Sequence, residues 1–212
     1  EGEDSFSNQT TNYGLGNTAG FWNTVEIVDL NDDGKLDIIA GNSGLNHKWH
    51  ASESSPVVVY LDDFDENSSL DPIIFYSFFG DQVPFASRDK LVSSLPYLKK
   101  KFLKYNDFVN AKDIVSLTER NKIFETKSVV EMRSMAFIQS EDNKFISLPL
   151  PKELQLSTIE DFYVDNDKIY YVGNFSGYVS ELGPSYSNPG GVLIGFDGNT
   201  HSSHRSLMLP IN

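Results

Sequence analysis

The chain of 212 residues carries 17 basic and 30 acidic side chains and no cysteine, which gives a formal net charge of −13. An acidic chain lacks the basic surface that neutralises phosphates, so this composition argues against a dedicated nucleic-acid binder. The absence of cysteine excludes a disulfide scaffold, thiolate metal centres and thiol catalysis. No apolar run approaches the roughly 18 residues of a membrane span, so we expect no transmembrane segment.

Most of the chain consists of short segments rich in β-branched and aromatic residues, each bounded by Gly, Asn, Asp or Pro. Such segments are typical of strands. In chain order, the predicted strands are 25–30, 36–40, 57–61, 73–79, 129–139, 145–148, 159–164, 169–172 and 192–196. Many short strands separated by turn residues indicate an all-β sandwich, barrel or propeller.

The segment from Arg88 to Lys122 has a different character. It contains nine basic and four acidic residues, a local charge of +5, so the rest of the chain carries −18. Its apolar residues recur every three or four positions, which is the period of a helix face. We therefore predict two short helices near 88–104 and 107–118, with Pro96 marking a kink or a split in the first.

An internal repeat narrows the choice among β architectures. The segment Ile-Ile-Ala-Gly-Asn-Ser-Gly at 38–44 returns as Tyr-Tyr-Val-Gly-Asn-Phe-Ser-Gly at 170–177, and an Asp-led turn precedes each copy. A third Asp-led turn begins at Asp63. Repetition of one supersecondary unit favours a solenoid or a propeller.

The first acidic turn, residues 29–37, is here called loop 1. Oxygen-bearing groups occupy its positions 1, 3, 5, 7 and 9, the seventh through a backbone carbonyl, and glycine occupies position 6. These groups belong to Asp29, Asn31, Asp33, Lys35 and Asp37. Hard oxygen ligands at this spacing are typical of a calcium site, although position 12 is Ala40 instead of the glutamate of an EF-hand. The alternative is that Asn-Asp-Asp-Gly forms only a hairpin turn.

Residues 63–71, here called loop 2, repeat the spacing. The corresponding groups belong to Asp63, Asp65, Asn67, Ser69 through its carbonyl, and Asp71, while Ser68 replaces the glycine and predicts a strained or looser loop. The third turn, at 161–169, keeps Asp161 and Asp165 but has Tyr163 and Ile169 at positions 3 and 9. We expect this turn to have lost the metal and kept the hairpin.

The segment 20–42, from Gly-Phe-Trp-Asn through the acidic turn to Ala-Gly-Asn, resembles an FG-GAP or VCBS repeat of integrin-α-like β-propellers. The segments 63–73, 86–89, 95–102 and 149–157 resemble exported repeat proteins of Bacteroidetes that often carry an ASPIC and UnbV segment. The resemblance implies one or two calcium ions held by loops 1 and 2. It also implies about three or four propeller blades with a small α-helical insertion: blades with calcium loops over 1–83, the insertion over 84–122 and further blades over 123–212.

The function that we expect is a non-catalytic, calcium-stabilised binding module for a protein or glycan ligand. The resemblance places it on an exported protein, at the cell surface, at the outer membrane or in the periplasm, and the chain is expected to be joined by the remainder of a larger propeller. No hydrolase elbow, P-loop or zincin motif is present. Two alternatives stay open. One is a polysaccharide-active propeller enzyme using carboxylates or the histidines His50 and His204, and the other is a docking subunit of an outer-membrane complex using the lysines at 99–101.

Overall fold

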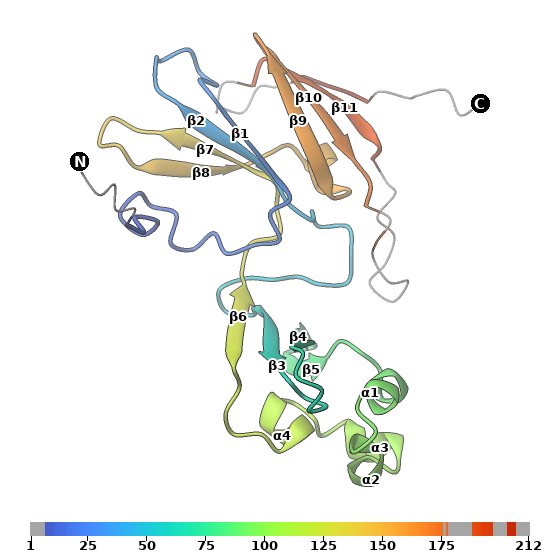
Figure 1. Cartoon of the computed structure of the whole chain (residues 1–212). Coiled ribbons are helices and arrows are strands. Elements are labelled where there is room, and N and C mark those ends of the chain that lie inside the picture. Colours follow the sequence, from blue (N-terminus) through green and yellow to red (C-terminus); the bar gives the residue numbers. More distant parts are fainter. Residues whose placement is uncertain (1–6, 176, 178–187, 197–202, 207–212) are drawn as a thin grey trace. The chain divides into compact units, whose positions relative to one another are not determined.

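The structure is a computed structural model that describes residues 7–175, 177, 188–196 and 203–206 (Figure 1). The chain divides into two compact units. Unit 1 comprises Glu1–Lys48 and Glu131–Asn212, and unit 2 comprises Trp49–Val130. The described residues form three four-stranded antiparallel sheets and a few short helices, so the prediction of a mainly β fold is confirmed.

The first sheet of unit 1 consists of β1 (Thr24–Val28), β2 (Asp37–Gly41), β7 (Met135–Gln139) and β8 (Phe145–Pro149), paired in that order. Each strand pairs with the next along the chain, although unit 2 separates β2 from β7 in sequence. Unit 2 is therefore an insertion between the second and third strands of an up-and-down sheet.

The second sheet of unit 1 contains β9 (Ile159–Asp165), β10 (Lys168–Gly173), β11 (Gly190–Ile194) and β12 (Ser203–Ser206). It is again an up-and-down sheet. A short 3-10 helix, η1 (Lys152–Gln155), precedes it. Figure 1 shows β9 beside β1, so the first strands of the two sheets are neighbours.

The core of unit 1 lies between these two sheets. Ile39 and Ala136 from the first sheet meet Phe162, Ile169 and Leu193 from the second, and all five are buried. Alternation along the strands explains this arrangement, because residues two apart point to the same face of a sheet. On the opposite face of the first sheet, a smaller cluster joins Ala40, Met135 and Phe137 to Leu15 and Trp22 of the N-terminal segment.

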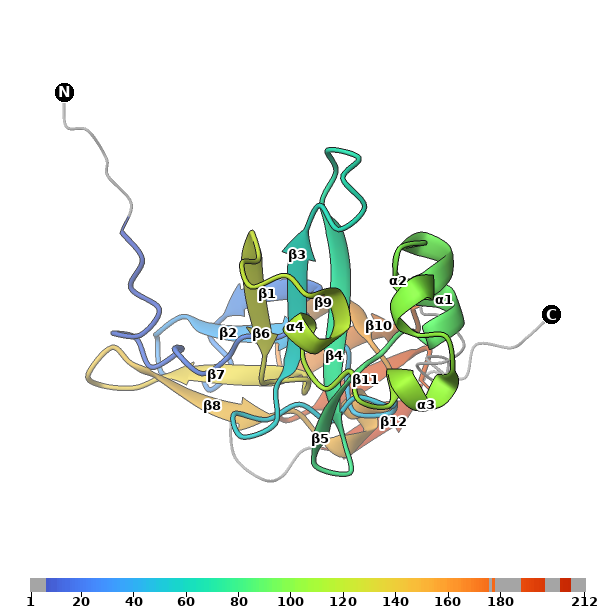
Figure 2. The ribbon, with the colours of Figure 1, turned by 90° about the horizontal axis from the view of Figure 1, so that it is seen from below.

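Unit 2 is built on a sheet of β3 (Val57–Asp62), β4 (Asp71–Phe78), β5 (Asp81–Pro84) and β6 (Glu125–Val129). Its order is β5-β4-β3-β6, so the fourth strand in sequence returns to pair with the first. Helices α1 (Arg88–Ser94), α2 (Leu98–Lys101), α3 (Tyr105–Phe108) and α4 (Ile114–Thr118) lie between β5 and β6 in sequence. Figure 2 shows α1, α2 and α3 grouped beside the long β3–β4 hairpin. Phe64, Ile73 and Phe75 form the core of this unit with Leu98 and Leu117.

The predicted split at Pro96 is confirmed: the segment 88–104 forms two helices, α1 and α2, because Leu95 leaves helical geometry and Pro96 cannot donate an N–H to the preceding turn. Two other sequence predictions need correction. The predicted helix at 107–118 is also divided, because the carboxylate of Asp113 accepts the N–H of Ser116 at 2.6 Å and starts α4 afresh. The predicted strand 129–139 is wrong as a single element, since β6 and β7 belong to different sheets. Unit 2, Trp49–Val130, contains the expected insertion at 84–122 together with the strands β3 to β6.

The chain re-enters unit 1 through a compact ion pair. The carboxylate of Glu131 accepts the N–H groups of Met132 and Arg133 at 3.0 and 2.8 Å, and the guanidinium Nε and Nη2 of Arg133 lie 2.8 and 2.6 Å from it. Burial by itself favours the neutral acid, but these hydrogen bonds outweigh it, so the pKa of Glu131 is lowered. The ionised carboxylate therefore stabilises the fold.

We predict that Glu131→Gln flattens the acid limb of the stability profile. A lowered folded-state pKa stabilises the protein above the ordinary value of about 4.5, and this stabilisation is lost as the pH falls through the folded-state pKa. Urea unfolding between pH 7 and pH 3 should show the wild type and the variant converging at the acid end. Glu160→Gln, an exposed carboxylate on β9, serves as the control and should leave the profile unchanged. A constant difference between Glu131→Gln and the wild type at every pH would contradict this prediction.

Candidate metal centres

Loops 1 and 2 occupy the same place in two hairpins. Loop 1 joins β1 to β2, and loop 2 joins β3 to β4. In each case the aspartate at position 9, Asp37 or Asp71, is also the first residue of the second strand. Both loops are therefore held at the ends of paired strands, as the sequence predicted.

The aspartate at position 1 organises each loop in the same way. The carboxylate of Asp29 accepts the N–H groups of Asp33 and Gly34 at 3.1 and 2.8 Å. The carboxylate of Asp63 accepts the equivalent N–H groups, of Asn67 and Ser68, at 2.9 and 2.8 Å. In each loop, the two oxygens of the position 1 carboxylate therefore bind two backbone N–H groups and fix the course of the turn.

The residues at positions 3 and 5 also make the same hydrogen bonds in both loops. The N–H at position 5 also lies 3.2 Å from the side-chain oxygen at position 3 in both loops, which is Asn31 in loop 1 and Asp65 in loop 2. The position 5 oxygens, of Asp33 and Asn67, each accept the N–H at position 7 at 2.8 Å. Two loops of different sequence therefore share one pattern of hydrogen bonds between side-chain oxygens and backbone N–H groups.

The backbone conformations at positions 4 and 6 also agree between loops 1 and 2. Position 4 has a positive φ in both loops, 58° at Asp32 and 63° at Glu66, and so does position 6, 81° at Gly34 and 70° at Ser68. The left-handed region favours glycine, yet a Cβ at Gly34 would meet no atom within 4 Å, so a side chain at position 6 is not sterically blocked there. Ser68 adopts the left-handed conformation of the glycine that it replaces, so the backbone of loop 2 is strained at this position, which is one of the two outcomes that the sequence predicted.

Position 9 distinguishes the two loops. Asp37 is fully buried, and its two oxygens accept the N–H groups of Leu30 and Gln139 at 2.9 and 2.8 Å. Asp71 has a buried Oδ2 that accepts no hydrogen bond from the described residues. Carboxylate oxygens of Asp63, Asp65 and Asp71 all lie within 4.8 Å of one another. Loop 2 therefore gathers three carboxylates around one point, whereas Asp37 in loop 1 also fastens the loop to β7.

The two loops differ in their local charge balance. In loop 1, the hydrogen bond from the N–H of Lys35 lowers the pKa of Asp33, and the Lys35 ammonium 3.7 Å away adds to that effect. The same ammonium lies 2.7 Å from Glu141. In loop 2, the three carboxylates make no ion pair with a lysine or arginine of the described residues. Like charges at this separation repel one another, so a divalent cation would relieve the repulsion most strongly in loop 2.

The third turn differs from both loops. Asp165 pairs with Lys168 across the β9–β10 hairpin, leaving Asn166 and Asp167 as a two-residue turn, with φ 53° at Asn166. The prediction of an ordinary hairpin turn is confirmed. Asp161 and Asp165 lie four positions apart within β9, roughly 13 Å along an extended strand, so they do not converge on one ion.

The backbone carbonyls of Lys35 and Ser69 stay predicted calcium ligands. The side chain of His204, named in the enzyme alternative, lies outside the described residues. No helix among the described residues is long and apolar enough to span a membrane.

Comparisons with protein-family models, with curated proteins and with solved structures each returned no match.

Proposed function

We propose that this chain is a non-catalytic, calcium-binding segment of a β-propeller protein of the FG-GAP or VCBS type, exported to the cell surface, outer membrane or periplasm, where it binds a protein or glycan ligand. The observation that carries the proposal is the hydrogen-bond pattern shared by loops 1 and 2. That pattern presents oxygens at positions 1, 3 and 5 at the spacing that calcium takes. One or two ions would be bound.

The architecture of unit 1 supports the propeller part of the proposal. Its two sheets are both up-and-down, they face each other across a shared apolar core, and their first strands are neighbours (Figure 1). Propeller blades have these properties. We assign the two sheets of unit 1 as blades and unit 2, with its different strand order, as an insertion into the first blade. This assignment gives two blades in the described residues, where the sequence predicted three or four.

Exposed apolar residues on the outer faces of these two sheets support the proposal that the chain belongs to a larger propeller. Val25 and Ile27 of β1 lie on the face away from the second sheet and are exposed. On the outer face of the second sheet, Tyr163 and Val172 are exposed as well. In our proposal further blades of a longer chain cover these apolar faces, because stacked blades bury such faces against each other.

The ions would act structurally. Each ion would neutralise a group of carboxylates at the end of a hairpin and hold the loop in one conformation, so that the loop and its surroundings present a fixed surface to a ligand. Extracellular modules bind calcium with dissociation constants of roughly 10⁻⁴ to 10⁻³ M, and such modest affinity suffices where calcium is plentiful.

Calcium titration of two loop 2 variants tests the proposal. Asp65→Ala removes a position 3 oxygen, whereas Glu66→Gln removes the same charge at position 4, whose side chain lies outside the group of three carboxylates. Calorimetry should show that Asp65→Ala weakens calcium binding at loop 2 at least about tenfold, which corresponds to about 1.4 kcal/mol. Glu66→Gln should bind within about twofold of the wild type. Equal losses in the two variants would show that the charge of the region matters and the position of the ligand does not, which is contrary to the proposal.

A further inference from the structure

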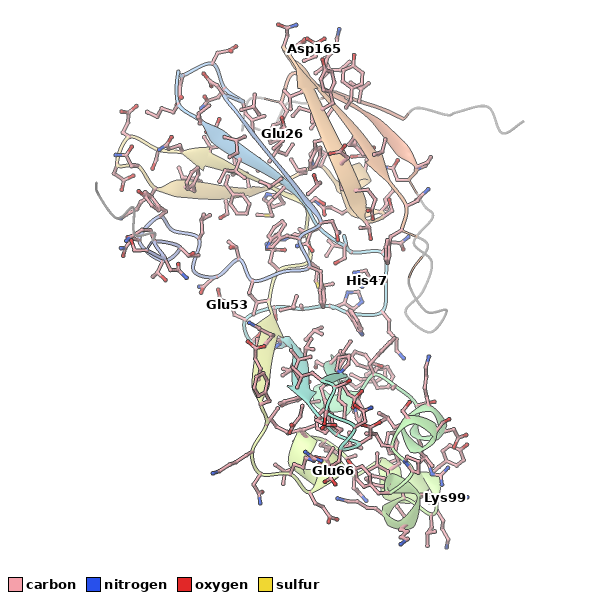
Figure 3. The ribbon with its side chains drawn as sticks, viewed as in Figure 1. Glu26, His47, Glu53, Glu66, Lys99 and Asp165 are labelled. Atoms are coloured by element: carbon pink, nitrogen blue, oxygen red, sulfur yellow. The ribbon has the colours of Figure 1, made fainter. Side chains whose placement is uncertain are left out.

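A hollow of about 430 Å³ lies beside loop 2, within unit 2. Its lining comes from three parts of the chain that are far apart in sequence. The lining residues are Phe64, Asp65, Glu66, Tyr97, Thr118 and Arg120. Figure 3 labels Glu66 on loop 2 and Lys99 on α2, the helix that Tyr97 precedes. The volume lies within the range of small-molecule sites, about 300–1,000 Å³.

Arg120 is held in place at one wall of the hollow. Its guanidinium lies 3.5 Å from a carboxylate oxygen of Asp62 and 3.5 Å from one of Glu66, and it donates to the carbonyl of Phe64 at 3.4 Å. The guanidinium carbon also lies 5.7 Å above the Phe64 ring. Charge-assisted hydrogen bonds of this type are commonly about 2.7–2.9 Å long, and a guanidinium has five N–H donors. Arg120 is therefore oriented and charge-balanced, while part of its hydrogen-bonding capacity stays available to a ligand.

Tyr97 supplies an aromatic surface with a polar end. Its side chain is 42% exposed and lines the hollow. Burial raises the pKa of Tyr97, and nearby carboxylates, of Glu66 among others, raise it further against the opposing effect of Arg120. The hydroxyl consequently stays protonated at neutral pH and can both donate and accept a hydrogen bond.

The charges of the hollow indicate the class of ligand. Asp62 and Glu66 balance Arg120, and Asp65 adds a further carboxylate, so the hollow offers no excess positive charge for an anion. A neutral sugar ring fits the lining better. Its hydroxyl groups lie around the ring edge, where adjacent pairs match the planar guanidinium and carboxylate groups, and its C–H groups lie on the ring faces, which suit an aromatic side chain.

We propose that this hollow binds one sugar unit of a neutral glycan, with Tyr97 against a ring face and Arg120 and Glu66 hydrogen-bonded to ring-edge hydroxyls. The proposal rests on the function proposed above and names its ligand. Asp65 belongs both to the group of three carboxylates and to the wall of the hollow. A calcium ion at loop 2 therefore fixes one wall of the sugar site, so glycan affinity increases with calcium.

The experiment uses the whole chain in saturating calcium and titrates it with neutral hexasaccharides of glucose, xylose and mannose, and with a polyuronate of the same length. At least one neutral hexasaccharide should bind, and Tyr97→Ala and Arg120→Gln should each weaken that binding at least about tenfold. The calcium affinity of both variants should stay within about twofold of the wild type, which also shows that they are folded. Phe124→Ala, which removes an exposed aromatic side chain of unit 2 outside the hollow, is the matched control and should bind the glycan normally.

Two outcomes would overturn the proposal. They are the absence of binding to any neutral hexasaccharide in a protein that binds calcium, and binding of the polyuronate alone. Equal losses in Tyr97→Ala and Phe124→Ala would also count against the hollow as the site. Failure of the proposed function gives a different result, because in that case the wild-type chain shows no calcium binding when titrated with calcium chloride alone.

Discussion

Replacement of Asp37 by asparagine lowers the free energy of unfolding by about 2–4 kcal/mol in chelator, and by at least as much with calcium. The side chain is fully buried, and each of its two oxygens accepts a backbone N–H, from Leu30 and from Gln139. An asparagine of the same shape has only one oxygen, so its amide N–H₂ must face one of these two donors. Both the lost hydrogen bond and the unpaired buried N–H then destabilise unit 1.

Equilibrium urea unfolding in the two conditions measures this effect. Asp32→Asn removes the same charge from the same loop at an exposed position and is the matched control. Asparagine also tolerates the left-handed conformation, φ 58°, that position 32 adopts, so the control should stay within about 0.5 kcal/mol of the wild type. A loss at Asp37 that disappeared in chelator would mean that the residue acts through the metal alone.

Replacement of Asp33 by alanine should destabilise the protein mainly when calcium is present. Asp33 is exposed at the surface of loop 1, and its described side-chain contacts are local, to Asn31 and Lys35. In chelator the change should lower the stability only slightly, because an exposed hydrogen bond contributes little net free energy. At a calcium concentration about 100-fold above the dissociation constant of loop 1, the variant should lack about 2.7 kcal/mol of stabilisation that the wild type gains there.

Thermal melts of the two proteins, each with and without calcium, separate these contributions. The difference between wild type and Asp33→Ala should grow as calcium is added, and the Asp32→Asn control should follow the wild type. If Asp33→Ala and the wild type gained equal stability from calcium, loop 1 would be a hairpin turn without a metal.

The sequence predicted most strands because their signal is local. β2, β4, β9 and β10 are rich in β-branched and aromatic residues and are bounded by turn residues, so propensity and burial agree. β5 and β6 were missed for a physical reason. β5 is a four-residue strand that ends in proline, and most of β6, Glu-Thr-Lys-Ser-Val, is polar and largely exposed. Their strand conformation depends on pairing with β4 and β3, which no local pattern reveals.

For the candidate site, too, the local features could be predicted from the sequence, whereas the contacts between distant residues could not. The spacing of Asp and Asn residues predicted the candidate ligands of loops 1 and 2 from the sequence alone, because the hydrogen bonds that shape these loops span only a few residues. The contact between Asp37 and Gln139 joins positions 102 residues apart and arises only because β7 pairs with β2 across the inserted unit. The hollow around Tyr97 and Arg120 could not be predicted either, since it forms only when the helices of unit 2 are folded beside loop 2.

A thermal melt of the whole chain in excess calcium and then in chelator shows whether the folded protein binds calcium. A ligand that binds only the folded state raises its stability, by about 2.7 kcal/mol for each site at 100 times the dissociation constant. For a chain of this size that corresponds to a rise in the melting temperature of roughly 5–10 °C. We expect such a rise in calcium and its reversal by the chelator, whereas equal melting temperatures in the two conditions would show that loops 1 and 2 are turns that hold no ion.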